Sequence, residues 1–292
     1  MVYNRGGVVK QYQDLLTNIL ENGTWQNNRT GIRTKMIPGA MIKFDMADGF
    51  PAMTTKKLAF KQVIGELLGF LRGADTLEQF NKLGCTVWDA NGKADAWTMS
   101  DEFCSVDKAG YLGRIYGVQW SNWNGELDQI QKLLRDIRKN PTSRRMIVTA
   151  WNPTELDRMA LPPCHYSFQV IIEQESGKMH LLWNQRSVDT FLGLPFNIAS
   201  YATLLHILAK MTGYIPGTLT GFLADVHIYE NHLDQVNEQL SRVPGKLPEL
   251  DIKDDSAWVW LSDMNIIDDL EPNDFALVNY YPQSSIKAEM AV

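Results

Sequence analysis

A cysteine stands between two prolines and a histidine in the stretch LPPCHYSFQ, residues 161–169. Cysteine attacks carbon as the thiolate, which forms near neutral pH where positive charge lowers the pKa of the sulfur. The stiff frame of Pro162 and Pro163 suits a sulfur that must point in one direction. The alternative for Cys164 is simple packing, because free cysteine is among the most buried residue types. The neighbouring motifs have to decide between the two interpretations.

Four arginines stand in or next to the motifs that the sequence makes conspicuous. Arg144 and Arg145 directly precede the β-like stretch MIVTAW, Arg186 lies in WNQRSVDTFLGLPFN, and Arg29 lies in the turn NNRTGIRT. A guanidinium fork binds phosphate through two parallel hydrogen bonds. The four arginines therefore predict a site for a small phosphate-like anion.

A second polar pattern lies in LADVHIYENH, where Asp225, His227 and Tyr229 alternate along a predicted strand. Alternating residues of a strand share one face of the sheet. Each of these residues alone is more often a satisfied structural hydrogen bond. Next to an anion site, however, His227 and Tyr229 are suited to bind a sugar hydroxyl.

The composition restricts the class of protein. The chain has 292 residues, of which 45% are hydrophobic, as is usual for a globular protein. No apolar run reaches the ~20 residues of a membrane helix, and the N-terminus lacks a signal peptide, so we expect a cytoplasmic protein without a membrane partner. The net charge of −6 argues against DNA. Three cysteines without CxxC spacing and five histidines without an HExxH pattern predict neither a disulfide nor a metal.

Hydrophobic periodicity predicts the elements that must position these residues. Helical spacing covers 11–22, 60–71, 127–141 and 197–213, and the last of these is so apolar that we expect it to be buried. Strand patterns cover 146–151, a hairpin over 165–174 and 179–187, and 218–229. The further predictions are a helix over 230–240 and loops with short helices over 74–110. Strands on both sides of buried helices indicate a mixed α/β or α+β fold, and no composition break divides the chain.

Four long motifs, in this order, resemble those of the folate-dependent thymidylate synthases: SRRMIVTAWNP, LPPCHYSFQ, QRSVDTFLGLPFNIASYATLLHILAKM and DVHIYENHLDQ. The similarity runs from KQYQDLL, near residue 10, to the C-terminal MAV. It implies one catalytic domain over 10–292, preceded by an N-terminal extension over 1–9. The implied fold is a large mixed β-sheet packed by helices, with two copies joined sheet to sheet as a homodimer.

The resemblance also implies the reaction and its catalytic residues. In that family the cysteine of the PCH motif adds to C6 of dUMP, which makes C5 able to attack the one-carbon unit of 5,10-methylenetetrahydrofolate. The amide of Asn197 matches the group that pairs with uracil, where a related deoxycytidylate hydroxymethylase carries aspartate. Glu66 is a carboxyl in an apolar helix, so its pKa should be raised, which suits proton transfer. The implied catalytic set is Cys164, Glu66, Tyr116, Arg186, Asn197 and Asp189.

Two further sets of residues follow from the resemblance, and two arginines are implied to act on a second subunit. The substrate-binding set is Arg29, Arg144, Arg145, Gln185, Arg186, Ser187, Asp189, Asn197, His227 and Tyr229. The folate-binding set is Lys56, Trp88, Asp189, Leu192, Gly193, Phe196 and Val292, whose terminal carboxylate resembles a latch over the folate. Arg144 and Arg145 match arginines that reach the phosphate of the partner subunit, which implies a shared site.

The sequence departs from the family pattern at several bulky positions. Gly69 replaces a tryptophan in ELLWF, Asn184 replaces an aromatic residue before QRS, and Leu223-Ala224 replaces two glycines. Asn91 stands where a second tryptophan is common, and Arg114 replaces a proline. Loss of bulk could admit water, which would add to the exocyclic methylene in place of hydride, give hydroxymethyl-dUMP and leave tetrahydrofolate. Both products therefore stay open, whereas the joint presence of Cys164 and Glu66 argues against a non-catalytic nucleotide- or RNA-binding protein.

Overall fold

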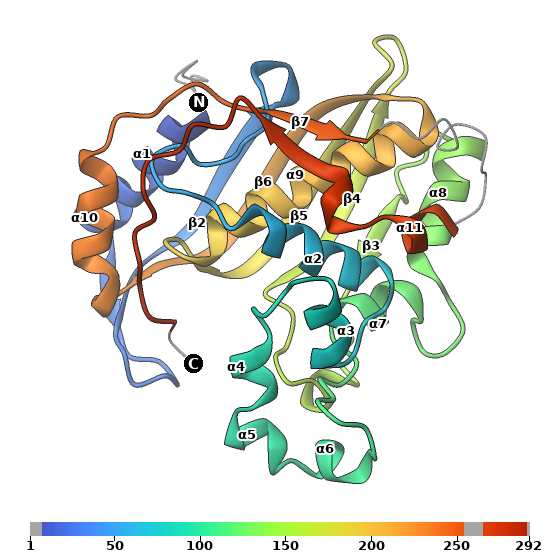
Figure 1. The fold of residues 1–292 in the computed structure, drawn as a ribbon, viewed down its shortest axis with the longest axis horizontal. Helices are drawn as coiled ribbons and strands as arrows, with labels where there is room; N and C mark the ends of the chain where they lie inside the picture. The colour runs from blue at the N-terminus through green and yellow to red at the C-terminus, as the bar shows by residue number, and fades with distance from the viewer. Residues whose placement is uncertain (1–7, 254–264, 291–292) are drawn as a thin grey trace.

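The computed structural model describes residues 8–253 and 265–290, and its centre is a mixed sheet of six strands (Figure 1). The strand order is β1-β2-β6-β5-β4-β3. Only β5 and β6 run parallel; the other neighbours in this sheet are antiparallel. The large mixed sheet and the α/β class predicted from the sequence are thus confirmed. The strands are β1 (Thr24–Gln26), β2 (Thr34–Asp45), β3 (Ile147–Thr149), β4 (His165–Glu173), β5 (Lys178–Asp189) and β6 (Ile215–Tyr229).

A long helix makes the crossover that the parallel pair β5 and β6 requires. This helix, α9 (Gly193–Thr212), packs on both strands and is buried along most of its length, as its apolar sequence predicts. It ends at Gly213, whose φ of 77° lies in the left-handed region that glycine adopts freely. Helix α2 (Phe60–Leu71) packs against α9, so the two form a helical layer on one face of the sheet (Figure 1).

Short helices form a lobe beside α2, and all but the last of them lie in 74–110, where the sequence predicts loops around short helices (Figure 1). They are α3 (Leu77–Lys82), α4 (Asp89–Gly92), α5 (Asp95–Thr98), α6 (Asp101–Ser105) and α7 (Tyr116–Ser121). The remaining helices are α1 (Val8–Asn22), α8 (Gln129–Lys139), α10 (Leu233–Ser241) and α11 (Asn265–Asp269), with 3₁₀ turns over 46–48, 156–158, 230–232 and 272–274. Within the described ranges, none of these helices has both the length and the apolar character that crossing a membrane requires.

Two features of the sheets were not predicted from the sequence. Strand β2 carries Pro38 and Gly39 in its middle, and these residue types normally argue against a central strand. They are tolerated because β1 pairs only with Thr34–Met36, so β2 is an edge strand where Pro38 lies opposite Asp225 of β6. The second feature is a small antiparallel sheet of β7 (Glu249–Ile252) and β8 (Phe275–Val278), which joins residues on both sides of an undescribed segment.

Candidate active site

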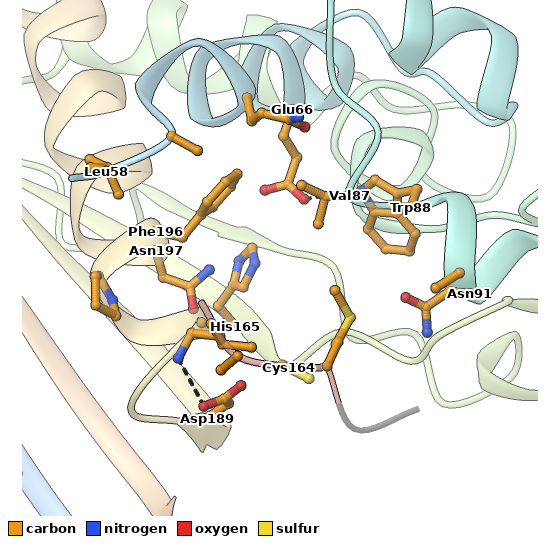
Figure 2. Close-up of a pocket in the computed structure, with 18 of the residues that line it drawn as sticks. Leu58, Glu66, Val87, Trp88, Asn91, Cys164, His165, Asp189, Phe196 and Asn197 are labelled. Carbon is orange, nitrogen blue, oxygen red and sulfur yellow. Dashed lines mark hydrogen bonds between the residues drawn. The ribbon is translucent and has the colours of Figure 1, made fainter. Parts of the chain in front are cut away.

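A cavity of about 690 Å³ opens where α2, α4, the end of β5 and the start of α9 meet. Its size falls within the range of small-molecule sites. Figure 2 shows the Glu66 carboxyl pointing from α2 toward the space that Cys164, Asn197 and Asp189 face from other walls. The cavity therefore joins residues that the sequence holds far apart.

Cys164 lies directly before β4, where backbone hydrogen bonds fix its position. Its amide N–H donates to the Tyr116 hydroxyl at 2.6 Å, and its carbonyl accepts from the Arg186 N–H at 2.8 Å. The Arg186 guanidinium donates to the carbonyls of Pro163 (2.9 Å) and Pro162 (3.0 Å). The two prolines thus supply acceptors as well as stiffness, and they bring a cation next to the thiol.

Charge and burial act in opposite directions on the thiol. Burial raises the pKa of Cys164, whereas Arg186, the Tyr116 hydroxyl and Arg29 lower it, and the net shift is upward. The sequence indicated a nucleophile with a lowered pKa, so this expectation is not met for the sulfur in the cavity as it stands. Desolvation outweighs the two guanidiniums because it penalises the thiolate directly.

Glu66 is a buried carboxyl in an otherwise apolar helix. Its Oε1 accepts a hydrogen bond of 3.0 Å from the Trp88 indole N–H. Burial raises the pKa of Glu66 to about 8, and the bond from Trp88 opposes this shift only in part. The high titration expected from the apolar helix is confirmed, and Glu66 is mainly protonated at pH 7.

Tyr116 and His165 form the aromatic floor between Glu66 and Cys164. Their rings lie 4.4 Å apart, and the His165 Nδ1 shares a 2.8 Å hydrogen bond with the Tyr201 hydroxyl. Burial lowers the pKa of His165 to about 3 and raises the pKa of Tyr116 well above its ordinary value. Both side chains are therefore neutral at pH 7.

A pair of amides faces the same space. Gln185 Nε2 donates to Asn197 Oδ1 at 3.0 Å and to the Ser187 carbonyl at 3.1 Å, while its own oxygen accepts from the Trp183 indole at 3.2 Å. These contacts fix Gln185 on both sides. The Asn197 amide is consequently held by its oxygen, and its nitrogen remains for a ligand.

Asp189 and Lys56 both line another side of the cavity. One Asp189 oxygen accepts from the N–H groups of Phe191 and Leu192, both at 3.1 Å, and so shapes the turn from β5 into α9. Figure 2 draws one hydrogen bond to Asp189 as a dashed line. The Lys56 ammonium donates to the Phe191 carbonyl and lies 3.6 Å from the centre of its ring. Burial lowers the pKa of Lys56 to about 7, although Asp189 acts against the shift.

The structure places the predicted site residues at different positions relative to the cavity. The cavity is lined by twelve of them, namely Lys56, Glu66, Trp88, Tyr116, Cys164, Gln185, Ser187, Asp189, Leu192, Gly193, Phe196 and Asn197. Arg186, Arg29 and Tyr229 do not line it. Arg186 and Arg29 nevertheless act electrostatically on Cys164, and Arg29 also acts on Tyr229. His227 lies beside Asp189 across the parallel strands and bonds Asp225 at 2.9 Å. Val292 lies outside the described residues.

Arg144 and Arg145 are not brought to this cavity within one chain. Both are exposed and precede β3, whose Ile147 lies opposite Gln169. Gln169 is five residues along β4 from Cys164, which corresponds to about 16 Å at the rise of a strand, and the two arginines lie farther along still.

The cavity also contains residues that the sequence did not single out. Ile286, Ala288 and Met290 line it from the C-terminal segment, which is held where the His232 ring bonds the Glu289 carbonyl at 2.7 Å. Asn91 lines it from α4. His165 could have been predicted to lie in the site because it follows Cys164 directly in the sequence. The C-terminal contacts could not be predicted in this way, because they depend on tertiary structure.

Comparison with known proteins is consistent across the chain. The family model described as thymidylate synthase matches residues 10–292. The thymidylate synthase of Pseudomonas putida is 40% identical over 327 aligned residues, which cover 97% of this chain and 100% of the relative. The thymidylate synthase of Coxiella burnetii (strain Dugway) is 43% identical over 288 residues, again covering 97% and 100%.

This chain belongs to the thymidylate synthase family. The resemblance that the four motifs predicted is thereby confirmed over almost the whole chain. Membership of the thymidylate synthase family assigns the protein to the one-carbon transferases, with dUMP and 5,10-methylenetetrahydrofolate as its substrates. The cavity around Cys164 and Glu66 is accordingly the candidate active site.

Proposed function

We propose that this protein transfers a one-carbon unit from 5,10-methylenetetrahydrofolate to C5 of dUMP and yields dTMP and dihydrofolate. The observation that carries this proposal is the convergence of a thiol, a protonated carboxyl and an oriented amide on one cavity. Cys164, Glu66 and Asn197 all line it. In a member of the thymidylate synthase family, these three groups match the three needs of the reaction: a nucleophile, an acid and a reader of the base.

The first role is that of Cys164. Its thiolate forms a bond to C6 of the pyrimidine, and the electrons of the C5–C6 double bond move through C4 to O4. Arg186 and Arg29 are the cations that lower the pKa of the sulfur, and they are also suited to bind the phosphate of dUMP. One pair of guanidiniums thus supports both the nucleophile and the anchor of the substrate.

The second role is that of Glu66. With a pKa raised to about 8, the carboxyl carries a proton at neutral pH and can stabilise the negative charge that develops on O4. The Trp88 indole holds one oxygen, which leaves the other for the substrate side. Tyr116, a neutral phenol between Glu66 and Cys164, is suited to relay the proton that leaves C5.

The third role is that of Asn197. Gln185 occupies one lone pair of Oδ1, so the amide nitrogen is free to donate to O4 and the second lone pair to accept the N3–H of uracil. Cytosine presents the reverse pattern at these atoms. A mismatch leaves a buried polar group unpaired, which costs about 1–3 kcal/mol or more. This arrangement supports dUMP as the nucleotide.

The choice between methyl and hydroxymethyl depends on water. When bound, the folate supplies first the one-carbon unit and then a hydride; water at the same carbon would give the hydroxymethyl group. The residues suited to hold the folate include Trp88, Leu192, Phe196 and Ile286, which form an apolar wall of the cavity. Such a wall favours hydride over water. The relatives reported above are named thymidylate synthase, and so they support the methyl product over the alternative.

We also propose a homodimer joined through the open face of the sheet. Met41 of β2 lies directly opposite Phe222 of β6, and both are more than 40% exposed. Ile147 and Ile171, on β3 and β4, are exposed as well. Exposed apolar side chains on several strands of a sheet favour a protein–protein interface. Pairing two sheets would also let Arg144 and Arg145 serve the site of the other copy.

Two further predictions from the sequence remain proposals. We infer one catalytic domain over 10–292 with an extension over 1–9, which the range of the family match supports. The cytoplasmic location stays a prediction.

Product analysis tests the reaction itself. The protein is incubated with dUMP and 5,10-methylenetetrahydrofolate, the nucleotide is analysed by mass spectrometry, and dihydrofolate is followed by absorbance. We expect dTMP and dihydrofolate in equal amounts. Hydroxymethyl-dUMP with no dihydrofolate, or unchanged dUMP, would overturn the proposal.

Subunit complementation tests the shared arginines. C164A and R145A, each inactive alone, are mixed and allowed to exchange subunits. In a mixed dimer one site keeps both Cys164 and the Arg145 of the other copy, so random exchange should restore about one quarter of the wild-type rate. Activity that never returns, although exchange is demonstrated, would contradict the sharing of Arg145.

A further inference from the structure

Position 69 of helix α2 has no room for a side chain. A Cβ atom added to Gly69 would lie 2.4 Å from Cε1 and 2.6 Å from Cδ1 of Phe80. Separations of this size lie far inside van der Waals contact. The Phe80 ring is fully buried and therefore occupies the space that any larger residue at 69 would need. Gly69 and Phe80 form a complementary pair, with the bulk on α3 instead of α2.

Phe80 is held firmly in this place. Helix α3 begins with a capping box in which Thr76 and Gln79 bond each other's backbone groups, and Phe80 is the next residue. The ring meets Phe70 edge to face, with centroids 5.8 Å apart. The ring also lies nearly parallel to Trp88, at 5.9 Å and 25°.

The contact with Trp88 connects Phe80 to the reaction. Trp88 lines the cavity and donates its indole N–H to Glu66 Oε1 at 3.0 Å. Phe80 itself lies behind Trp88 and does not line the cavity. The chain of contacts from Gly69 through Phe80 and Trp88 thus ends on the carboxyl that serves as the acid in the proposed function.

We propose that Phe80 is a positioning residue for this reaction: by closing over Gly69 and supporting the Trp88 ring, it holds the Glu66 carboxyl in place and keeps water from entering behind it. The inference rests on the proposed function of Glu66. It also accounts for the small residue at position 69, because the bulk absent there is supplied by Phe80. Loss of the ring should loosen Trp88 and hydrate the carboxyl.

The test compares F80A with a matched control, F44A. Phe44 is an equally buried phenylalanine on β2 that does not line the cavity. Both variants should lose thermal stability. Only F80A should release hydroxymethyl-dUMP, at several times the wild-type share of product, and shift the alkaline limb of kcat downward by about one pH unit. The milder F80L keeps part of the bulk, so its share of hydroxymethyl-dUMP and its pH shift should lie between those of F80A and wild type. F80L also provides the test if F80A does not fold.

A second substitution tests whether the bulk itself matters. G69L in the F80A background should refill the space from α2, and it should restore the product ratio and the pH profile at least halfway. An infrared titration of the Glu66 carboxyl, taken as the difference from E66Q, gives a readout that needs no turnover. If wild type forms no dTMP, the proposed function fails, whereas a lowered carboxyl midpoint in F80A still supports the positioning role. A folded F80A with unchanged product ratio and unchanged carboxyl midpoint would overturn the inference.

Discussion

The two walls of the cavity hold their reactive groups by different means. Cys164 donates its amide N–H to Tyr116, and the guanidinium of Arg186, held by the carbonyls of the preceding prolines, acts electrostatically on its sulfur. Glu66 is surrounded by rings, and among the described residues only the Trp88 indole opposes the effect of burial on its pKa. Burial raises the pKa of both groups, but cations counteract it at the thiol alone.

This difference corresponds to two chemical tasks. A nucleophile has to become an anion when the substrate arrives, so its wall supplies positive charge. An acid has to stay neutral at the operating pH, so its wall supplies desolvation. The contrast predicts that substitutions on the Cys164 wall act through charge, and those on the Glu66 wall act through protonation and water.

The largest effect should follow removal of the nucleophile. C164A takes away the sulfur that forms the bond to C6, and kcat should fall by at least about 10⁴-fold. Steady-state formation of dihydrofolate measures the loss. C104A, at an exposed cysteine, is the control and should keep the wild-type rate. A C164A rate within tenfold of wild type would show that this wall holds no nucleophile.

Replacement of the acid should have the next largest effect. E66Q keeps the shape but cannot donate the same proton, so kcat should fall by about 10²–10⁴-fold. In wild type the protonated form of Glu66 is lost as pH rises through about 8, so kcat should decline above that pH. The E66Q profile should lack this decline. A decline of the same size and midpoint in E66Q would assign it to another group.

Replacement of the Asn197 amide, which binds the base, should have the third largest effect. N197D replaces the donor that faces O4 with an acceptor, so kcat/KM for dUMP should fall by about 100-fold while dCMP begins to bind. Competition between the two nucleotides, followed by isothermal titration, measures the change. Gln185 remains as the support of position 197 in both proteins. Full retention of the preference for dUMP would refute the pairing scheme.

The smallest effect should come from a change that keeps the charge. R186K retains a cation but loses the fork that binds the carbonyls of Pro162 and Pro163, and kcat/KM should fall by about tenfold. The pKa of Cys164 should rise further, which pH-dependent alkylation of the thiol detects as an upward shift of its midpoint. The exposed R135K is the control. An unchanged midpoint in R186K would show that the guanidinium does not act on the sulfur.

The same contrast explains which features could be predicted from the sequence. The β4–β5 hairpin, α2 and the buried α9 follow from local periodicity, and so does the high pKa of a carboxyl among apolar neighbours. Strand β2 could not be predicted, because Pro38 becomes acceptable only at an edge that β1 leaves open. The net pKa of Cys164 could not be predicted either, since it depends on how much burial opposes Arg186.

No local sequence pattern predicts that the Cys164 wall and the Glu66 wall face each other across one cavity. That Glu66 faces Cys164 was implied by family resemblance, and the pair formed by Gly69 and Phe80 carried no sequence signal at all. A contact of this type depends on how α3 folds back against α2, which periodicity does not describe. Glycine at position 69, where the family pattern has tryptophan, would by itself suggest a more open site. The structure shows that Phe80 fills this space.

The most direct test of the account traps the bond that its central claim requires. The protein is mixed with 5-fluoro-dUMP and 5,10-methylenetetrahydrofolate, denatured, digested and mapped by mass spectrometry. Fluorine at C5 cannot leave as a proton does, so the reaction stops before the folate and then the sulfur are released. We expect one stable adduct per active site, joining nucleotide and folate and attached to Cys164. An adduct on another residue, or none under conditions in which the same preparation converts dUMP to dTMP, would contradict the claim.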